Sequence, residues 1–216
     1  MQITHLGHSA VLVEVEGTRL LIDPGAFSTG WHGLTDLDAV LFTHLHPDHV
    51  DAARVPALLT ANPGARVLTE PGVPAAVDLG VEESRVTPLP AGSTHAVGAI
   101  GIEAVGGEHA VIHRDIPMIG NVGLLLRAEG QPTLFHPGDS LAAVPSGVDV
   151  LAVPTHAPWA AMKEHVDFMR AVAAPQAFPI HDGLLNQVGR GMLLGRYAEM
   201  TPSEVLDLAD GQPRTF

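Results

Sequence analysis

Three histidines and one aspartate lie close together in the segment Thr43-His44-Leu45-His46-Pro47-Asp48-His49. Alternate side chains of an extended segment point to the same side, so His44 and His46 can reach one ion. Asp48 and His49 follow on a turn and can reach a second ion. Because four side chains of metal-ligand type fall within six residues, the segment predicts a metal site rather than a run of solvated surface residues.

Further ligands for such a site must come from other parts of the chain. Three later segments place histidine or aspartate directly after an apolar run, namely Gly106-Gly107-Glu108-His109, His136-Pro137-Gly138-Asp139-Ser140 and Pro179-Ile180-His181-Asp182-Gly183. The chain has no cysteine, which excludes thiolate ligands, iron–sulfur clusters and a cysteine nucleophile. Any metal must therefore be bound by nitrogen and oxygen atoms.

Short apolar runs predict the strands that position these residues. Residues 10–15 and 19–22 indicate a hairpin around Glu16-Gly17, and residues 39–43 indicate a buried strand that leads into the histidine segment and then into a helix over 51–60. Further strands are predicted at 66–69, 99–105, 122–127, 133–136, 148–153 and 177–180, and further helices at 74–79 and 160–172. With no linker and no repeat, this alternation predicts one α/β domain over residues 1–216.

The charge balance excludes some classes of partner. Asp and Glu number 24 against 11 Lys and Arg, for a formal net charge of −13, so a nucleic acid backbone would be repelled. No apolar run reaches the ~20 residues that a membrane-spanning helix needs, and no targeting signal is evident. We therefore expect a soluble cytoplasmic protein without nucleic-acid or membrane partners; the sequence does not indicate its oligomeric state.

The order of these segments resembles the metallo-β-lactamase fold superfamily of hydrolases, whose pattern is H-x-H-x-D-H, then a third histidine, a bridging aspartate and a last histidine. The resemblance spans nearly the whole chain and implies a four-layer αββα sandwich. Finer details resemble small bacterial metal-dependent hydrolases that include the ascorbate-6-phosphate lactonases: Gly7-His8-Ser9, Leu21-Ile22-Asp23-Pro24, Phe135-His136-Pro137-Gly138-Asp139 and Pro179-Ile180-His181.

The resemblance implies two sets of ligands. The first metal would be bound by His44, His46 and His109, the second by Asp48, His49 and His181, and Asp139 would bridge the two. His113 lies four residues after His109 and competes for the third position, although Gly106-Gly107 before His109 favours His109. The match departs from those relatives at Thr155-His156-Ala157-Pro158 and at Asp182, which leaves the substrate open.

Five further residues are candidates for the surroundings of the metals. Asp23 either orients a metal-bound histidine or caps a turn before Pro24. His8 either lines the pocket or is a structural residue, and His156 either contacts substrate and donates a proton or is a structural loop residue. Trp159 forms a pocket wall or packs against a helix, and Lys163 binds an anionic group or is simply solvated.

These residues together predict a metal-dependent hydrolase. Two divalent ions, with Zn²⁺ expected before Mn²⁺ or Fe²⁺, would hold a bridging hydroxide that Asp48 helps to ligate and orient. The substrate would be a small ester, lactone or phosphodiester, and an anionic one is compatible with two cations in the site. Two alternatives are a ribonuclease Z-like phosphodiesterase, which the acidic charge disfavours, and a non-catalytic metal-binding sensor, which would be expected to have lost a ligand.

Overall fold

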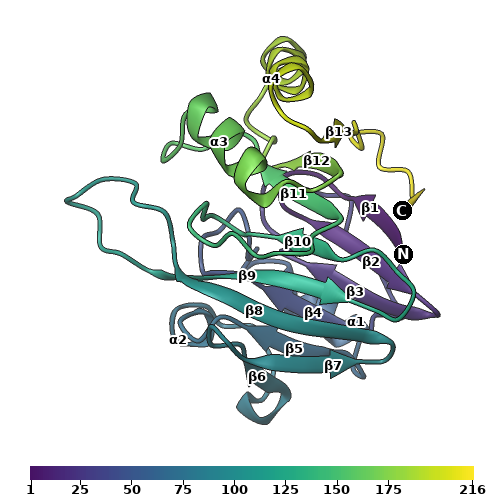
Figure 1. Cartoon of the computed structure of the whole chain (residues 1–216). Helices are drawn as coiled ribbons and strands as arrows, with labels where there is room; N and C mark the ends of the chain where they lie inside the picture. Colours follow the sequence, from purple (N-terminus) through teal and green to yellow (C-terminus); the bar gives the residue numbers. More distant parts are fainter.

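Two seven-stranded sheets form the centre of the protein, and the computed structural model describes all 216 residues (Figure 1). The first sheet has the order β14-β1-β2-β3-β4-β5-β6, and the second has the order β13-β12-β11-β10-β9-β8-β7. The strands of the first sheet are β1 (Gln2–His5), β2 (Val11–Val15), β3 (Thr18–Ile22), β4 (Ala39–Phe42), β5 (Arg66–Thr69), β6 (Val86–Pro88) and β14 (Arg214–Thr215). Those of the second are β7 (Thr94–Val97), β8 (Ile100–Glu108), β9 (Gly120–Arg127), β10 (Leu134–His136), β11 (Val150–Pro154), β12 (Gln176–Ile180) and β13 (Glu204–Val205).

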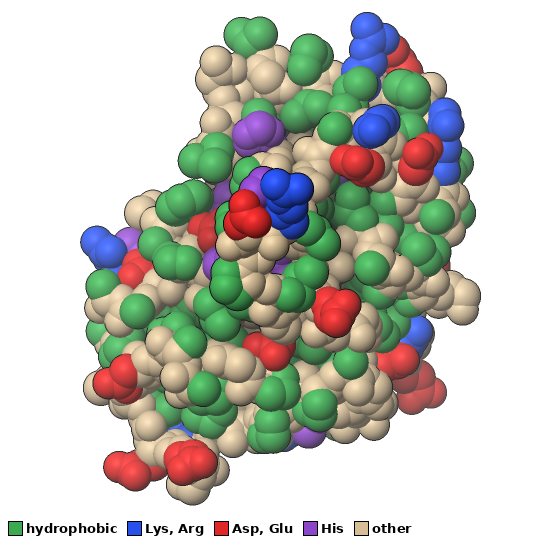
Figure 2. Space-filling view, turned by 90° about the vertical axis from the view of Figure 1, so that its left-hand side faces the viewer, with side chains coloured by type: hydrophobic (Ala, Val, Ile, Leu, Met, Phe, Trp, Pro, Cys, Tyr) green, Lys and Arg blue, Asp and Glu red, His purple; other side chains and the backbone are tan.

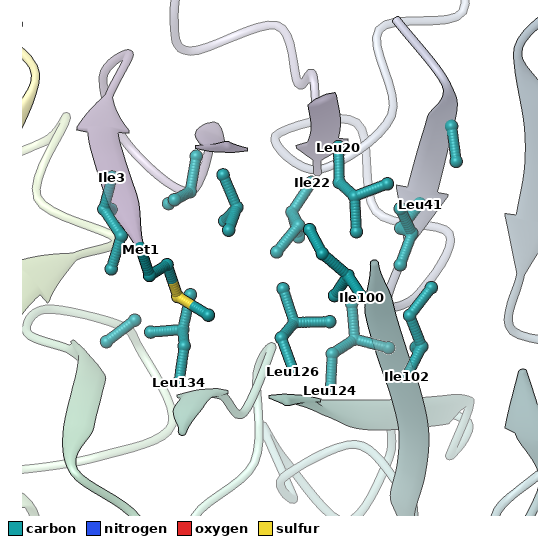
Figure 3. Close-up of a cluster of buried hydrophobic side chains, with 14 of the residues drawn as sticks. Met1, Ile3, Leu20, Ile22, Leu41, Ile100, Ile102, Leu124, Leu126 and Leu134 are labelled. Carbon is teal, nitrogen blue, oxygen red and sulfur yellow. The ribbon is translucent and has the colours of Figure 1, made fainter. Parts of the chain in front are cut away.

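The molecule has four layers in the order helices, sheet, sheet, helices, and a hydrophobic cluster lies between each pair of neighbouring layers. The largest lies between the sheets, where Leu20, Ile22 and Leu41 of the first sheet face side chains such as Leu124 and Leu126 of the second (Figure 3). A second cluster packs the outer face of the first sheet against α1 (Val55–Ala61) and α2 (Val73–Ala76), and a third packs the second sheet against α3 (Met162–Val172) and α4 (Gln187–Met200). A 3₁₀ turn, η1, covers Glu83–Arg85. The predicted α/β, four-layer αββα sandwich is therefore confirmed.

The strand directions bring the ligand-type residues to one edge of each sheet. After the β2–β3 hairpin, whose turn residues Glu16 and Gly17 both have positive φ, strands β3, β4, β5 and β6 run parallel. In the second sheet β10, β11 and β12 are also parallel. Since the carboxyl ends of parallel strands meet at one edge, the residues that follow β3, β4, β10 and β12 gather there.

Several elements differ from the sequence-based expectation. Strands β1, β6, β7, β13 and β14 were not expected, and the helix expected over 74–79 covers only Val73–Ala76, because the backbone is already extended at Val77. The helix expected over 51–60 begins at Val55, because the Asp51 carboxylate accepts the N–H groups of Ala53 and Arg54 and forms a turn before it. Strand β8 continues to Glu108, so that Gly106-Gly107 pair with β9 instead of forming a loop. Helix α4 was not expected, because it contains three glycines and buries only Leu193 and Tyr197, which gives little helical signal.

No helix is both long enough and apolar enough to cross a bilayer.

The loop after β3 packs directly on the histidine segment. The N–H of Ala26 donates to the Pro47 carbonyl at 2.8 Å, and the N–H of Asp51 donates to the Pro24 carbonyl at 3.1 Å. Between these contacts, a Cβ atom on Gly25 would lie 1.7 Å from the carbonyl oxygen of Asp48. Only glycine permits this approach of the two backbones, which fixes the position of the segment that carries Asp48.

We expect Gly25→Ala to lower the free energy of unfolding by about 1–3 kcal/mol, because the added methyl group forces the two loops apart. Gly64→Ala is the matched control, since a Cβ there meets nothing within 4 Å and a surface change of this kind alters stability by less than about 0.5 kcal/mol. Urea denaturation measures both. Equal midpoints for Gly25→Ala and the wild type would contradict the close packing of the loops.

Candidate metal centre

Two adjacent groups of side chains could each hold a metal ion at the edge where the parallel strands end. One contains His44, His46, His109 and Asp139, and the other contains His8, Asp48, His49 and His181. Within each group the ligand-type atoms all lie within 4.8 Å of one another. The structure thus brings together all seven residues that the resemblance implied as ligands, and it adds His8.

The ring of His44 is oriented by a chain of hydrogen bonds from the buried Asp23 carboxylate. The hydroxyl of Thr43 donates to Asp23 Oδ2 at 2.6 Å. Since that hydrogen is used, the Thr43 oxygen accepts from His44 Nδ1, which lies 3.1 Å away. His44 Nδ1 therefore carries the proton, and Nε2 is left with the lone pair that a metal ligand needs.

Asp23 orients a second ring in the same way. His49 Nδ1 lies 2.7 Å from Asp23 Oδ2 and donates to it, while His49 Nε2 lies 3.1 Å from Asp139 Oδ1. Asp23 Oδ1 also accepts the N–H of Thr43 at 2.8 Å. This one carboxylate, fully buried, thus makes the hydrogen bonds that the orienting interpretation, one of the two drawn from the sequence, requires.

Main-chain carbonyls orient two more rings. His109 Nδ1 donates to the carbonyl of Ala110, and His181 Nδ1 donates to the carbonyl of His156, both at 2.6 Å. The opposite nitrogens approach Asp139 Oδ2, with His109 Nε2 at 3.5 Å and His181 Nε2 at 3.2 Å. In four histidines, therefore, the Nδ1 side is fixed to oxygen and Nε2 points to the centre of the site.

Asp139 lies between the two groups of side chains. Its N–H donates to Asn121 Oδ1 at 2.9 Å, and Asn121 also donates to the Pro137 carbonyl at 3.0 Å, so the turn after β10 is held from β9. Trp159 Nε1 donates to Asp139 Oδ2 at 3.1 Å. The other oxygen, Oδ1, is buried and lies 3.1 Å from His49 Nε2 without a hydrogen bond of good geometry, as suits a carboxylate placed to bridge two cations.

The two central carboxylates and two of the imidazoles depend on each other's charge. Burial would raise the pKa of Asp139, but the His49 charge and the nearby rings of His109 and His181 lower it well below its usual range. Burial would likewise lower the pKa of His181, yet the close approach of Asp139 and Asp48 raises it to about 9. Burial would also lower the pKa of His49, yet the charges of Asp139 and Asp23 raise this pKa well above its usual range. Without metal, protons on imidazoles supply the positive charge that the carboxylates require.

The donor atoms fit a divalent cation. His109 Nε2, His181 Nε2 and Asp139 Oδ1 are buried at 3.5, 3.2 and 3.1 Å from a carboxylate or imidazole partner but form no hydrogen bond of good geometry. Buried polar atoms left unpaired in this way are costly unless something binds them. Imidazole and carboxylate groups without cysteine suit Zn²⁺, Mn²⁺ or Fe²⁺. A metal ion would displace the protons on His49 and His181 and satisfy the unpaired atoms at the same time.

His8 differs from His44, His49, His109 and His181 in the nitrogen that carries its proton. The N–H of Gly183 donates to His8 Nδ1 at 3.1 Å, and burial lowers the pKa of His8, which keeps the ring neutral. The proton is then on Nε2, which donates to Asp48 Oδ2 at 3.1 Å. His8 therefore orients Asp48 as a hydrogen-bond donor and has no lone pair to offer to a metal.

Two sequence-based candidates, Lys163 and His113, lie away from this centre, and a third, His156, contacts it through its backbone. The Lys163 side chain is 79% exposed, with its ammonium 4.0 Å from a Glu164 carboxylate oxygen, so the structure does not bring it to the metal ligands. His113 is exposed and contacts Asp115 at 3.5 Å, whereas its competitor His109 is buried in the site. His156 contributes its carbonyl to the orientation of His181, while its own side chain is exposed.

Three supporting residues were not identified from the sequence. Thr43 and Asn121 make the hydrogen bonds described above, and the hydroxyl of Ser9 lies 3.3 Å from His49 Nε2. Thr43 and Ser9 are each next to a named histidine, which is a weak signal. Asn121 is the single buried polar residue within the strand Gly120–Arg127, and its position inside an apolar run could have indicated a special role.

A cleft of about 590 Å³ opens beside His109 and Trp159. It lies between the segment after β8, the loop after β10 and helix α3, and its lining is mainly hydrophobic. Figure 2 shows this face of the molecule, with histidine side chains visible between hydrophobic ones. Trp159 thus forms a wall between the cleft and Asp139, in agreement with the pocket interpretation of this residue.

Known proteins are similar to this chain in sequence and in fold. Residues 2–181 match the beta-lactamase superfamily domain. Protein Rv0786c of Mycobacterium tuberculosis is 44% identical over 217 residues, with full coverage of both chains. A UPF0173 metal-dependent hydrolase of Chelativorans is 33% identical over 155 residues, which are 65% of this chain and 63% of that protein.

The structure of the metallo-beta-lactamase fold protein YhfI from Bacillus subtilis superposes with a TM-score of 0.77 at 15% identity and covers 100% of this chain and 99% of that one. The match to YhfI shows the same arrangement of sheets and helices, and the domain match covers most of the chain. This chain therefore belongs to the β-lactamase superfamily and has the metallo-β-lactamase fold of its metal-dependent hydrolases.

Proposed function

We propose that this protein is a metal-dependent hydrolase with two divalent ions, most simply Zn²⁺, that cleaves a small ester, lactone or phosphodiester. The observation that carries the proposal is the convergence of imidazoles with fixed Nδ1 atoms on Asp139, with the unpaired atoms at the centre of the site. The relatives named metal-dependent hydrolases support the same reaction class.

The residues would divide between two ions. His44, His46 and His109 would bind the first, Asp48, His49 and His181 the second, and Asp139 both. When bound, such ions lower the pKa of water toward 7 and polarise the carbonyl or phosphoryl oxygen of the substrate, so that no nucleophile from the protein is needed.

The chain's own residues fix the geometry of this reaction. Asp23 and the carbonyls of Ala110 and His156 hold the imidazoles before substrate arrives, which avoids reorganisation during the reaction. Asp48, held by His8, would orient the attacking water. His156 lies exposed on the loop that leads to Trp159 and is our candidate for protonating the leaving group.

Single alanine substitutions of His109 and of His113 test which of the two residues is the third ligand. Loss of a residue that only supports a ligand typically lowers metal affinity about 10- to 100-fold. We expect His109→Ala, which removes a ligand itself, to lower metal affinity by more than this and to abolish chelator-sensitive hydrolysis of phenyl acetate. His113→Ala is the matched control and should keep both properties. Metal content by mass spectrometry and initial rates measure them. Full metal content in His109→Ala would remove this residue from the ligand set.

Substitutions of His8 test whether it acts as a donor to Asp48. His8→Leu removes the hydrogen bond and should weaken metal affinity about 10- to 100-fold, as loss of a supporting hydrogen bond does. His8→Gln can place an amide N–H near the position of Nε2 and should recover most of the affinity. Competition with a chromophoric chelator measures both variants. Equal losses in the two variants would show that His8 acts only through packing.

A further inference from the structure

The cleft beside the metal centre has the size and position of a substrate pocket. Its volume of about 590 Å³ lies in the range of small-molecule sites. His109 and Trp159, which contact Asp139, are part of its wall. A substrate whose reacting bond lies at the metal centre can therefore extend one substituent into the cleft.

The wall of the cleft is apolar over most of its area. Val111 and Met118 come from the segment after β8, Leu141 and Val144 from the loop after β10, and Phe168 from α3. Val111, Met118 and Val144 are exposed by 62%, 49% and 50% of their surface. Exposed apolar side chains gathered around a concave site indicate a binding surface, because leaving them in water is unfavourable.

The charges of the cleft all have the same sign. Glu108, Glu164 and Asp167 belong to its wall, and no lysine or arginine does. The cations nearest to the wall in the sequence are Arg114, Lys163 and Arg170. The side chains of Arg114 and Lys163 are 89% and 79% exposed and lie beside Asp115 and Glu164, and Arg170 Nε donates to the Met200 carbonyl at 2.8 Å. A negatively charged substituent would therefore meet carboxylates without a compensating cation.

We propose that the cleft selects an apolar substituent without negative charge and prefers a cationic end to an anionic one. This inference rests on the proposed hydrolase function and narrows its substrates to neutral or cationic esters and lactones with an apolar chain. Hydrolysis adds water across the acyl C–O bond: this bond breaks, the acyl carbon gains hydroxyl to become an acid, and the leaving oxygen gains a proton. The sequence-based interpretation left an anionic substrate open, and this proposal disfavours one.

Three phenyl esters of matched length test the preference with the metal-loaded protein. They are phenyl hexanoate, the monophenyl ester of adipic acid, and phenyl 5-(trimethylammonio)pentanoate, which carry a neutral, an anionic and a cationic end. We expect kcat/KM for the neutral and cationic esters to exceed that for the anionic ester at least tenfold. Equal or faster hydrolysis of the anionic ester would overturn the proposal.

A charge reversal in the cleft provides the matched variant. Asp167 is exposed on α3 and makes no hydrogen bond or ion pair, so Asp167→Lys should leave the fold intact and raise kcat/KM for the anionic ester several-fold. Glu129→Lys makes the same charge change in the turn after β9, far along the strand from the site, and should have no such effect. An equal response of both variants would assign the preference to net charge and not to the cleft.

A binding measurement separates this proposal from the proposed function. Trp159 lines the cleft, whereas Trp31 is 1% exposed and belongs to the cluster on the outer face of the first sheet. Tryptophan fluorescence should therefore report hexyltrimethylammonium and hexanol binding to chelated protein, with hexanoate at least tenfold weaker. If no ester is hydrolysed but this order holds, the hydrolase proposal fails and the preference of the cleft stands; tighter hexanoate binding overturns the preference whether or not hydrolysis occurs.

Discussion

The geometry of the metal centre depends on the oxygen atoms that hold the Nδ1 side of each histidine ring. A neutral imidazole has one proton and one lone pair, so an Nδ1–H donated to oxygen leaves Nε2 free to bind a cation. Asp23 supplies this anchor directly to His49 and, through Thr43, to His44. Carbonyl groups supply it to His109 and His181. The fold therefore orients four rings with Nε2 toward the centre of the site before any metal arrives, and a metal ion has to displace only the Nε2 protons of His49 and His181.

Backbone conformation shows that the fold bears a cost for this arrangement. Asp23, His8 and His181 all have positive φ, at 47°, 51° and 56°, in a region that residues other than glycine adopt rarely and at a cost of about 1 kcal/mol or more. The N–H of His181 donates to the His8 carbonyl at 2.9 Å, which links the two segments. Three of the six non-glycine residues with positive φ are thus site residues, and strain that the surrounding structure supports is typical of functional positions.

Much of the fold followed from local sequence signals. The hairpin was predicted because Glu16-Gly17 suits a tight turn between apolar runs. The histidine segment was placed after a buried strand because residues 39–43 form a short, mainly apolar run. Helix α4 was missed because its glycines and its mostly exposed surface carry little amphipathic signal. The four-layer arrangement came from the resemblance, since periodicity does not specify how two sheets pack.

The candidate site was predictable in its residue types but not in its supporting contacts. The spacing of His44, His46, Asp48 and His49 indicated a metal site, whereas the choice between His109 and His113 required the burial seen in the structure. The donor function of His8 depends on the N–H of Gly183, which is 175 residues away. Such long-range hydrogen bonds leave no pattern in a single sequence.

The number of metal ions bound per chain tests the central claim most directly. Purified protein would be stripped with a chelator, reloaded with Zn²⁺, desalted and measured by inductively coupled plasma mass spectrometry. The convergence of the two groups of ligands on Asp139 predicts two ions per chain for the wild type. No retained metal, with the fold intact by circular dichroism, would contradict the assignment of this site as a metal centre.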